Sequence, residues 1–207
     1  MDKAPEKELH FPVAPWRDGS YEHVTGKDWP DVAQTPAAKA IAEKFPESFL
    51  GFTGYRGDPC VLLRKDKIVD ILKFLRDGAD LQFDFLRDLF AMDNLQTESR
   101  RKQFSDLGFK EVARFEVIYI LYSLRFRHDI RLRVAVSEED ANIQSAFKVF
   151  KGANWYEREA WEMYGVNFVG HPNLRRLITH ESFEGHPLRK DYPIRRRHNI
   201  IKPVDIL

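Results

Sequence analysis

The sequence contains one cysteine, Cys60, and no long hydrophobic run. A single thiol excludes an internal disulfide, a cysteine-rich zinc site and an iron-sulfur cluster held by this chain alone. We expect Cys60 to be an ordinary buried residue of a reducing compartment. The longest unbroken apolar stretch, Val117 to Tyr122, is far shorter than the roughly 20 residues of a membrane-spanning helix. Any membrane association is therefore expected to go through a partner.

The motifs of nucleotide-binding proteins and hydrolases are also missing. Neither G-x-x-x-x-G-K-[ST] nor G-x-G-x-x-G occurs, and Gly51, Gly54 and Gly57 lack the strand-to-helix context of a phosphate-binding loop. No elbow motif supports a Ser or Cys nucleophile paired with His. The opening residues, M-D-K-A-P-E-K-E-L-H, have neither the apolar core of a signal peptide nor the Arg-rich character of a transit peptide. A cytosolic protein of bacterial type is the expected class.

The charge balance argues against a nucleic-acid-binding protein. The formal net charge is +1, and the densest basic run is Arg195 to His198. Such a run can contact phosphates, but Tyr192 is the one aromatic residue within several positions of it, so stacking platforms are missing. Nucleic-acid binding through this run stays an alternative. A carboxylate-rich protein surface fits better, because arginine pairs bidentately with acids.

The hydrophobic pattern predicts one α+β domain with an extension at each end. The hydrophobic fraction of 43% suits a single domain with a real core. We assign residues 1–30 to an irregular N-terminal extension, 31–165 to the domain and 166–207 to an extended C-terminal arm. The expected order of elements is helix, two strands, helix, three strands, helices. This order predicts a mixed sheet with helices packed on one face.

Caps, turns and periodicity give the elements. Pro36 opens an alanine-rich helix that ends before Pro46, and Asp66 is expected to cap a core helix that stops at Gly78. The predicted strands are Phe49–Tyr55 and Cys60–Leu63, joined by the turn Gly57-Asp58-Pro59, then Leu81–Phe85 with a helix as local alternative, Phe115–Leu124 and Ile130–Val136. A cap pair and an apolar stripe predict a further core-facing helix from Ser137, Asp140, Ile143, Ala146, Phe147 and Phe150.

The last helix is predicted over Trp155 to Tyr164. Asn154 and Glu157 have the spacing of a capping box, and Gly165 falls where a left-handed C-terminal cap is expected. Arg158 and Glu162, four residues apart, share a helix edge, as do Glu157 and Trp161. The alternative interpretation of this charge cluster is a solvated helix edge.

The arm that follows has neither a helical nor a strand period. Prolines at 172, 187, 193 and 203 bias the residues before them towards extended geometry. An apolar, basic segment of this length without periodicity most simply lies along another protein. A disordered tail is not expected, because its apolar residues are too many: Leu174, Leu177, Ile178, Phe183, Leu188, Tyr192, Ile194, Ile200 and Ile201.

A metal site is an alternative for the same region. Imidazole and carboxylate are common zinc ligands, and the candidates are His171, His180, His186 and His198 with Glu157 and Glu159. Against it, the histidines have no fixed spacing, and two of them precede proline, which suits turns equally well. This alternative would make the chain a metal-dependent hydrolase.

The helix and arm carry a family resemblance. E-R-E-A-W-E-M-Y-G-V-N-F-V-G-H-P-N-L-R-R followed by F-E-G-H-P-L-R-K-D-Y-P resembles the signature of the 30 kDa or C subunit of proton-pumping NADH-quinone oxidoreductase, respiratory complex I. The upstream stretches F-D-F-L-R-D-L-F-A-M-D and F-E-V-I-Y-I-L-Y-S-L are also similar, so the resemblance covers about Cys60 to Pro193. His180-Glu181-Ser182 departs from the family pattern, and the first 45 residues or so match nothing.

The resemblance implies a non-catalytic structural subunit of a multi-subunit translocase. That complex transfers electrons from NADH through iron-sulfur clusters to a quinone and couples this to proton translocation. This chain would bind no cofactor, and FMN, NADH, the clusters and the quinone would belong to partner subunits. Its partners would be chiefly the quinone-site (D) subunit and the cluster-bearing subunits, on the cytoplasmic face of the bacterial membrane, with no nucleic acid. The corresponding subunit of a membrane-bound hydrogenase is the alternative.

Ten residues of the signature are the predicted partner-binding site, and no catalytic or metal-binding residue is expected. A segment that orders on binding needs charge-assisted hydrogen bonds for its register and apolar anchors for its affinity. We therefore expect these side chains to fix the arm to the quinone-site subunit or to the domain: Glu157, Arg158, Glu159, His171, Arg175, Arg176, His186, Arg189, Lys190 and Asp191.

Overall fold

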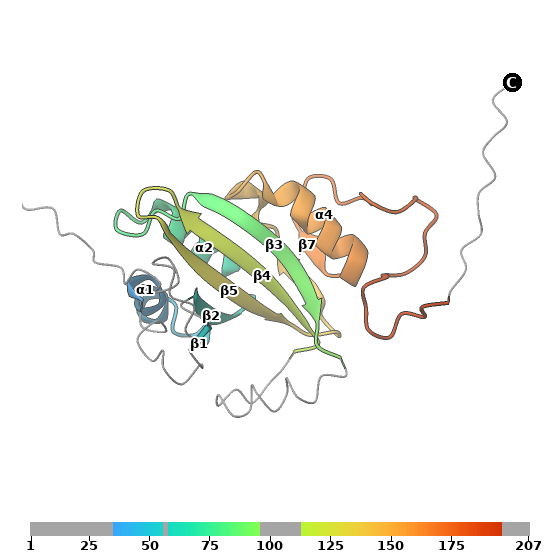
Figure 1. Cartoon of the computed structure of the whole chain (residues 1–207), viewed down its shortest axis with the longest axis horizontal. Helices are drawn as coiled ribbons and strands as arrows, with labels where there is room; N and C mark the ends of the chain where they lie inside the picture. Colours follow the sequence, from blue (N-terminus) through green and yellow to red (C-terminus); the bar gives the residue numbers. More distant parts are fainter. Residues whose placement is uncertain (1–34, 56–57, 96–112, 196–207) are drawn as a thin grey trace, which may run out of the picture.

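The computed structural model describes residues 35–55, 58–95 and 113–195 (Figure 1). Within them, helices pack on a mixed five-stranded sheet, and a second sheet of two short strands lies beside it. The predicted α+β fold is confirmed. The expected N-terminal extension falls outside the described residues. None of the described helices is long and apolar enough to span a bilayer.

The elements follow the predicted order as far as β5. They are α1 (Pro36–Lys44), β1 (Phe49–Tyr55), β2 (Asp58–Arg64), α2 (Ile68–Asp77), β3 (Phe85–Asp93), β4 (Phe115–Ser123) and β5 (His128–Val136). The chain continues through β6 (Asn142–Gln144), the 3-10 helix η3 (Ala146–Lys148), α4 (Ala153–Tyr164) and β7 (Asn167–Val169).

The five strands lie in the order β1-β2-β5-β4-β3. β2 and β5 are parallel, and the other neighbours are antiparallel, which makes the sheet mixed. Tyr119 of β4 lies opposite Leu132 of β5, and Val117 lies opposite Val134. All of these side chains are fully buried, because alternate residues of a strand point to the same face.

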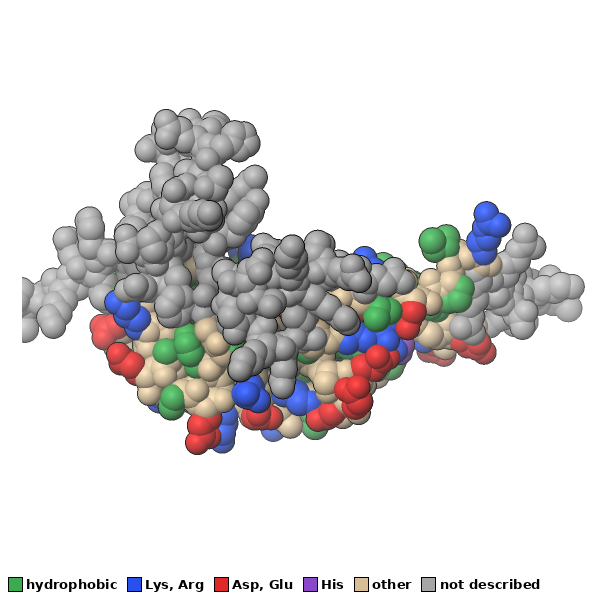
Figure 2. Space-filling model, turned by 90° about the horizontal axis from the view of Figure 1, so that it is seen from below, with side chains coloured by type: hydrophobic (Ala, Val, Ile, Leu, Met, Phe, Trp, Pro, Cys, Tyr) green, Lys and Arg blue, Asp and Glu red, His purple; other side chains and the backbone are tan. Residues whose placement is uncertain are grey.

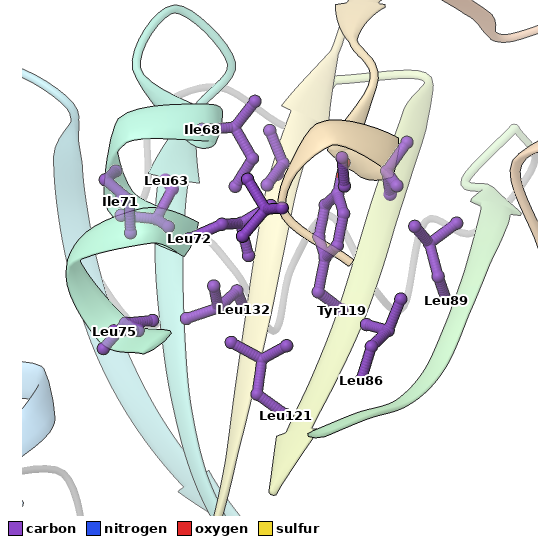
Figure 3. Close-up of a cluster of buried hydrophobic side chains, with 14 of the residues drawn as sticks. Leu63, Ile68, Ile71, Leu72, Leu75, Leu86, Leu89, Tyr119, Leu121 and Leu132 are labelled. Carbon is purple, nitrogen blue, oxygen red and sulfur yellow. The ribbon is translucent and has the colours of Figure 1, made fainter. Parts of the chain in front are cut away.

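The core forms between this face of the sheet and the helices. Figure 3 shows α2 lying over the sheet, with Ile68, Leu72 and Leu75 directed towards it. The helix presents them because apolar residues recur every three or four positions along it. From α4, Ala153 and Ala160 belong to the same cluster. This packing holds α4 beside β3, as Figure 1 shows.

The helix predicted from Ser137 to Phe150 is wrong. Ile143 lies in β6, opposite Phe168 of β7 in a parallel pair, and Ala146 begins η3. Ser145 caps η3 by accepting from Phe147 N at 3.2 Å. A short strand followed by one turn of 3-10 helix buries Ile143, Ala146 and Phe150 of the predicted stripe and leaves Phe147 partly buried.

Several predicted boundaries also needed correction. The N-cap of α2 is Lys67, not Asp66. Of the predicted strand Leu81–Phe85, only Phe85 lies in β3, which runs from Phe85 to Asp93. The helical alternative there is wrong as well. Asp58 and Pro59 are part of β2, while Gly57 of the predicted turn lies outside the described residues.

Candidate functional site

The site lies where the arm returns over the C-terminal half of α4. The predicted left-handed cap is confirmed at Gly165, whose φ is 79°. After β7 the described arm, residues 170–195, contains no helix or strand. Figure 1 shows this segment leaving β7 and looping past the end of α4. Its contacts with α4 are made mainly by backbone groups and charged side chains.

The start of α4 differs from the prediction. The helix begins at Ala153 behind an N-cap at Gly152 that makes no side-chain hydrogen bond. Glu157 does not close a capping box but points into the protein, where its carboxylate accepts from Ser145 Oγ and Ala146 N, each at 2.6 Å. Glu157, Arg158 and Glu162 are all buried. The alternative of a solvated helix edge is therefore wrong.

Glu162 is the centre of the contact between α4 and the arm. Its carboxylate is fully buried and accepts from the successive amides of Leu177 (2.6 Å), Ile178 (2.9 Å) and Thr179 (2.6 Å). The Thr179 hydroxyl donates to the same carboxylate, and Arg176 lies 3.9 Å from it. Consecutive N–H groups that converge on one anion form a backbone nest.

The charge of Glu162 is stabilised by this nest. Burial by itself would raise the pKa of the carboxyl group, since it disfavours the charged form. The hydrogen bonds from Thr179, Ile178 and Leu177 outweigh burial and lower the pKa to about 2. At neutral pH the arm is thus held by a carboxylate that is fully ionised.

The backbone carbonyl groups at the end of α4 are satisfied by the arm as well. The last turn of a helix leaves carbonyl groups without intrahelical partners. Glu162 O accepts from His186 Nδ1 at 2.9 Å, Met163 O from Leu188 N at 3.1 Å, and Tyr164 O from Arg189 Nε at 2.7 Å. The G-H-P-L-R block of the signature is therefore a C-terminal cap for α4.

Gly165 makes this cap possible. A Cβ atom at this position would lie 2.7 Å from His186 Nε2 and closer still to the Arg189 guanidinium. Its positive φ is also strained for any residue with a side chain. The His186 ring is consequently packed against the helix end, and burial lowers its pKa, with the charges of Arg189 and Arg176 lowering it further.

Arg158 supports the arm one turn earlier on α4. Its guanidinium donates to the carbonyl groups of Arg175 (3.0 Å) and Arg176 (2.9 Å). It also lies 5.2 Å from the ring of Trp155, which is 61% exposed. Nearby, His171 Nε2 contacts Asn154 O at 3.1 Å and its Nδ1 accepts from Asn173 N, so the ring is neutral with the proton on Nε2. Arg158 and His171 thus fix the start of the arm.

The far end of the described arm is fixed to the sheet. Lys190 N donates to Asp93 at the end of β3 at 2.9 Å, and Asp191 pairs with Arg114 at 2.8 Å. Arg114 also pairs with Asp93 at 3.4 Å and with Glu138. One partly buried arginine therefore joins the arm to the ends of β3 and β5.

The predicted site residues fall into two groups. Side chains of Arg158, His171, Arg176, His186, Arg189 and Asp191 make contacts within the chain, as does Glu157 on the opposite side of α4. The side chains of Glu159, Arg175 and Lys190 are exposed. The structure thus brings most of the signature together around the arm, and leaves on the surface Glu159, Arg175, Lys190 and about half of the Asp191 side chain.

Glu162 was not among the predicted site residues. A signal for it was present, because an acid in the last turn of a helix opposes the helix dipole. It also follows Arg158 by four residues, the less favourable order for a helical ion pair. Both anomalies are explained by the nest, since Glu162 binds the arm and not its own helix.

The outer side of the arm exposes apolar side chains. Ile178 is 61% exposed, Leu188 49% and Ile194 fully, while Leu177, Phe183 and Tyr192 are partly buried. Exposed apolar side chains next to an ordered charged network are typical of protein interfaces. Leu174 is also partly buried, and Ile200 and Ile201 lie outside the described residues.

The two alternative sites find little support in the described residues. His180 bonds to Ser182, and His171 and His186 bond to backbone groups. Among residues 35–55, 58–95 and 113–195, no three His, Cys, Asp or Glu side chains are grouped to hold a metal. Figure 2 shows Lys, Arg, Asp and Glu interspersed on the described part of one face, without a large basic patch. Most of the Arg195 to His198 run is not described.

Sequence comparisons show that this chain is similar to the members of one protein family. Residues 61–198 match the family described as respiratory-chain NADH dehydrogenase, 30 Kd subunit. The C subunit of NADH-quinone oxidoreductase from Roseiflexus castenholzii is 42% identical over 149 residues, which cover 72% of this chain and 78% of that protein. The C/D subunit of NADH-quinone oxidoreductase from Yersinia pestis bv. Antiqua is 40% identical over 167 residues, or 80% of this chain and 26% of that protein.

Solved structures show the same fold. The trypsin-resistant fragment (1–134) of Nqo5 aligns with a TM-score of 0.52 at 24% identity, covering 66% of this chain and 97% of the fragment. A chain of the membrane-bound sulfane sulfur reductase, an archaeal respiratory membrane complex, aligns with a TM-score of 0.53 at 18% identity. The alignment covers 75% of this chain and 83% of that chain.

Proposed function

The chain belongs to the family of the 30 kDa subunit of respiratory-chain NADH dehydrogenase, and from this membership we propose that it is the structural C subunit of complex I. The complex would transfer electrons from NADH through iron-sulfur clusters to a quinone and couple this transfer to proton translocation. The observation that carries the proposal is the family match, which includes β4, β5, α4 and the arm up to residue 198.

A non-catalytic role agrees with the chemistry of the site. The buried charges of α4 bind backbone amides and carbonyl groups, as in Glu162 with Leu177 and Arg158 with Arg175. Such contacts use the hydrogen-bonding capacity of these charged groups to fix the position of the arm on α4. The complex as a whole is an enzyme. This subunit would hold its neighbours in place and would not take part in the chemical reaction. FMN, the clusters, NADH and the quinone would be bound by its partners.

The proposed partners are the quinone-site (D) subunit and the cluster-bearing subunits. The Yersinia relative supports the quinone-site partner, because its name joins the C and D subunits and this chain matches only 26% of its length. Two proteins joined in one chain are commonly neighbours when they are separate. The assembly would lie on the cytoplasmic face of the bacterial membrane, with this subunit attached through its partners.

The outer side of the arm is the proposed contact surface. Of the predicted partner-binding residues, Arg175 and Lys190 on the arm and Glu159 on α4 are exposed and can reach a neighbour. Ile178 and Leu188 lie on the arm and supply apolar area. Hydrogen bonds of the exposed charged side chains would fix how the arm aligns with the neighbouring subunit. Burial of the apolar side chains would supply the affinity.

Affinity purification of the tagged chain from gently solubilised membranes tests this function. We expect a large, iron-rich assembly that oxidises NADH and reduces a quinone. The variant Ile178→Asp should lower the yield of this assembly, while Leu124→Asp, at a residue with the same 61% exposure on the β4-β5 turn, should not. Recovery of the wild-type chain without partners would overturn the proposal.

Arg189→Ala separates an assembly role from a catalytic one. Arg189 donates to Tyr164 O and packs on Gly165, so its loss should loosen the arm and lower the amount of complex. Turnover for each complex that does assemble should stay unchanged. A normal amount of complex with slowed quinone reduction would contradict the assembly role. An assembly that handles hydrogen and no NADH would indicate the hydrogenase alternative, which the relatives' names do not favour.

A further inference from the structure

The arm contacts its own domain at three successive places along its length. Residues 177–179 surround the carboxylate of Glu162, residues 186–189 cap the last carbonyl groups of α4, and residues 190–191 reach Asp93 and Arg114. These contacts need no second chain. They differ from the expectation of a segment that becomes ordered only when a partner binds.

We propose that Glu162 is a positioning residue that holds the arm on α4 in the free chain, so that neighbouring subunits meet a preformed surface. The inference rests on the proposed function for the identity of those neighbours. The docking itself requires only this chain. Glu162 acts through the arm, because its carboxylate is fully buried and touches residues 177–179.

The number and kind of the hydrogen bonds support this role. Three backbone amides and one hydroxyl converge on one carboxylate, and hydrogen bonds to a charged acceptor are the strong ones. Each is worth enough to change a docking equilibrium roughly tenfold or more. The same residue also accepts from His186 through its backbone carbonyl. Glu162 thus binds two parts of the arm that are separated in sequence.

A preformed arm has a consequence for assembly. Ordering a flexible segment on binding consumes part of the interaction free energy, and a segment that is already ordered avoids this loss. In the docked arm Leu177 is partly buried, while Ile178 and Leu188 are exposed. The neighbouring subunit would then meet Ile178, Leu188 and Arg175 in fixed positions.

Limited proteolysis of the full chain, purified without partners, tests the docking. Trypsin cuts after Arg and Lys, and the side chains of Arg176 and Arg189 are partly buried by their contacts in the docked arm. Cleavage at these two sites, followed by mass spectrometry, reports the open fraction of the arm when opening is fast. We expect Glu162→Gln to increase both rates by about tenfold or more.

Glu159→Gln is the matched control, because it makes the same change on the same helix at an exposed side chain. It should leave both cleavage rates at the wild-type value. Thr179→Val removes a single donor from the nest and should increase both cleavage rates by about tenfold even if Glu162→Gln fails to fold. Circular dichroism checks that the domain of each variant is intact.

The inference is overturned if wild-type Arg176 is cut as fast as in a peptide of the same sequence. It is also overturned if neither Glu162→Gln nor Thr179→Val accelerates the cleavage. These results would leave the proposed function standing, because the chain could still join the complex through an arm that orders on binding. Failure of the wild-type chain to purify with an iron-rich complex would instead reject the function and leave the docking intact.

Discussion

Glu157 of α4 accepts a hydrogen bond from Ser145 Oγ at 2.6 Å, and the Glu157 side chain is fully buried. This bond ties the signature helix to the connection between β6 and η3. Burial raises the pKa of Glu157 to about 7, although the hydrogen bonds from Ser145 and Ala146 act in the opposite direction. Glu157 and Glu162 lie on opposite sides of one helix. The pKa of Glu157 is raised, whereas the pKa of Glu162 is lowered.

Glu157→Gln should remove a pH dependence from the stability of the domain. A carboxyl whose pKa is about 7 in the folded state and 4.5 when unfolded binds more protons in the folded state between these values. Its contribution to the free energy of unfolding falls as pH rises through that window, by about 3 kcal/mol in total. Urea unfolding at pH 4.5 and pH 7.5 measures the change. Glu159→Gln should keep the wild-type dependence, and equal slopes in Glu157→Gln and wild type would contradict the assignment.

The sequence predicts the sheet well and the polar site poorly, for a physical reason. In Ile130–Val136 the alternation of apolar residues follows from one buried face, so the strand is visible in the chain itself. The spacing of Ile143, Ala146 and Phe147 fits a helix equally well, and only the pairing of β6 with the distant β7 decides against it.

Buried charges leave a weaker trace. Glu157 and Glu162 look like surface residues of an amphipathic helix, because most of their partners are backbone amides that any residue but proline can supply. The block around His186 and Arg189 was recognised by resemblance to a family, and its role as a helix cap needed the structure. Gly165 was found from local chemistry, since a left-handed cap depends on one residue.

Gly165→Ala should loosen the arm and destabilise the chain. The positive φ alone costs about 1–2 kcal/mol for a residue with a side chain, and contact with Arg189 and His186 adds to it. The free energy of unfolding should therefore fall by about 2 kcal/mol or more. Gly152→Ala is the control, because a Cβ there meets nothing within 4 Å. It should stay within about 0.5 kcal/mol of wild type, and a similar loss in both variants would contradict the argument.

Asp93→Ala should be much more destabilising than Asp191→Ala, although both residues pair with Arg114. The Asp93 side chain is fully buried and also accepts from the amides of Lys190 and Leu95, whereas the Asp191 side chain is 51% exposed. Breaking a buried pair costs about 3 kcal/mol, while an exposed pair is worth under about 1 kcal/mol. Chemical denaturation of the two variants measures both values. Equal losses would mean that Asp93 is not the main anchor of Arg114.

The docking of the arm should weaken as pH falls, through His186. Burial lowers the pKa of His186, the charges of Arg189 and Arg176 lower it further, and the hydrogen bond to Glu162 O only partly opposes them. A histidine with a depressed pKa stabilises the docked state above about pH 6.5, its ordinary value, and that stabilisation is lost as pH falls towards the folded-state pKa. This direction is opposite to that of Glu157, whose contribution to stability grows as pH falls.

Hydrogen exchange at one amide can separate the two effects. Leu188 N donates to Met163 O only while the arm is docked, so its protection reports docking and not the stability of the whole domain. After correction for the intrinsic exchange rate, its protection should fall between pH 7.5 and pH 5.5, while the protection of core amides in β4 and β5 should rise with the contribution of Glu157 to the stability of the domain. His186→Gln should lower the protection at pH 7.5 and abolish its pH dependence. If the wild-type protection does not change with pH, the protonation of His186 is not coupled to the arm, and the helix cap is held by Arg189 and the backbone.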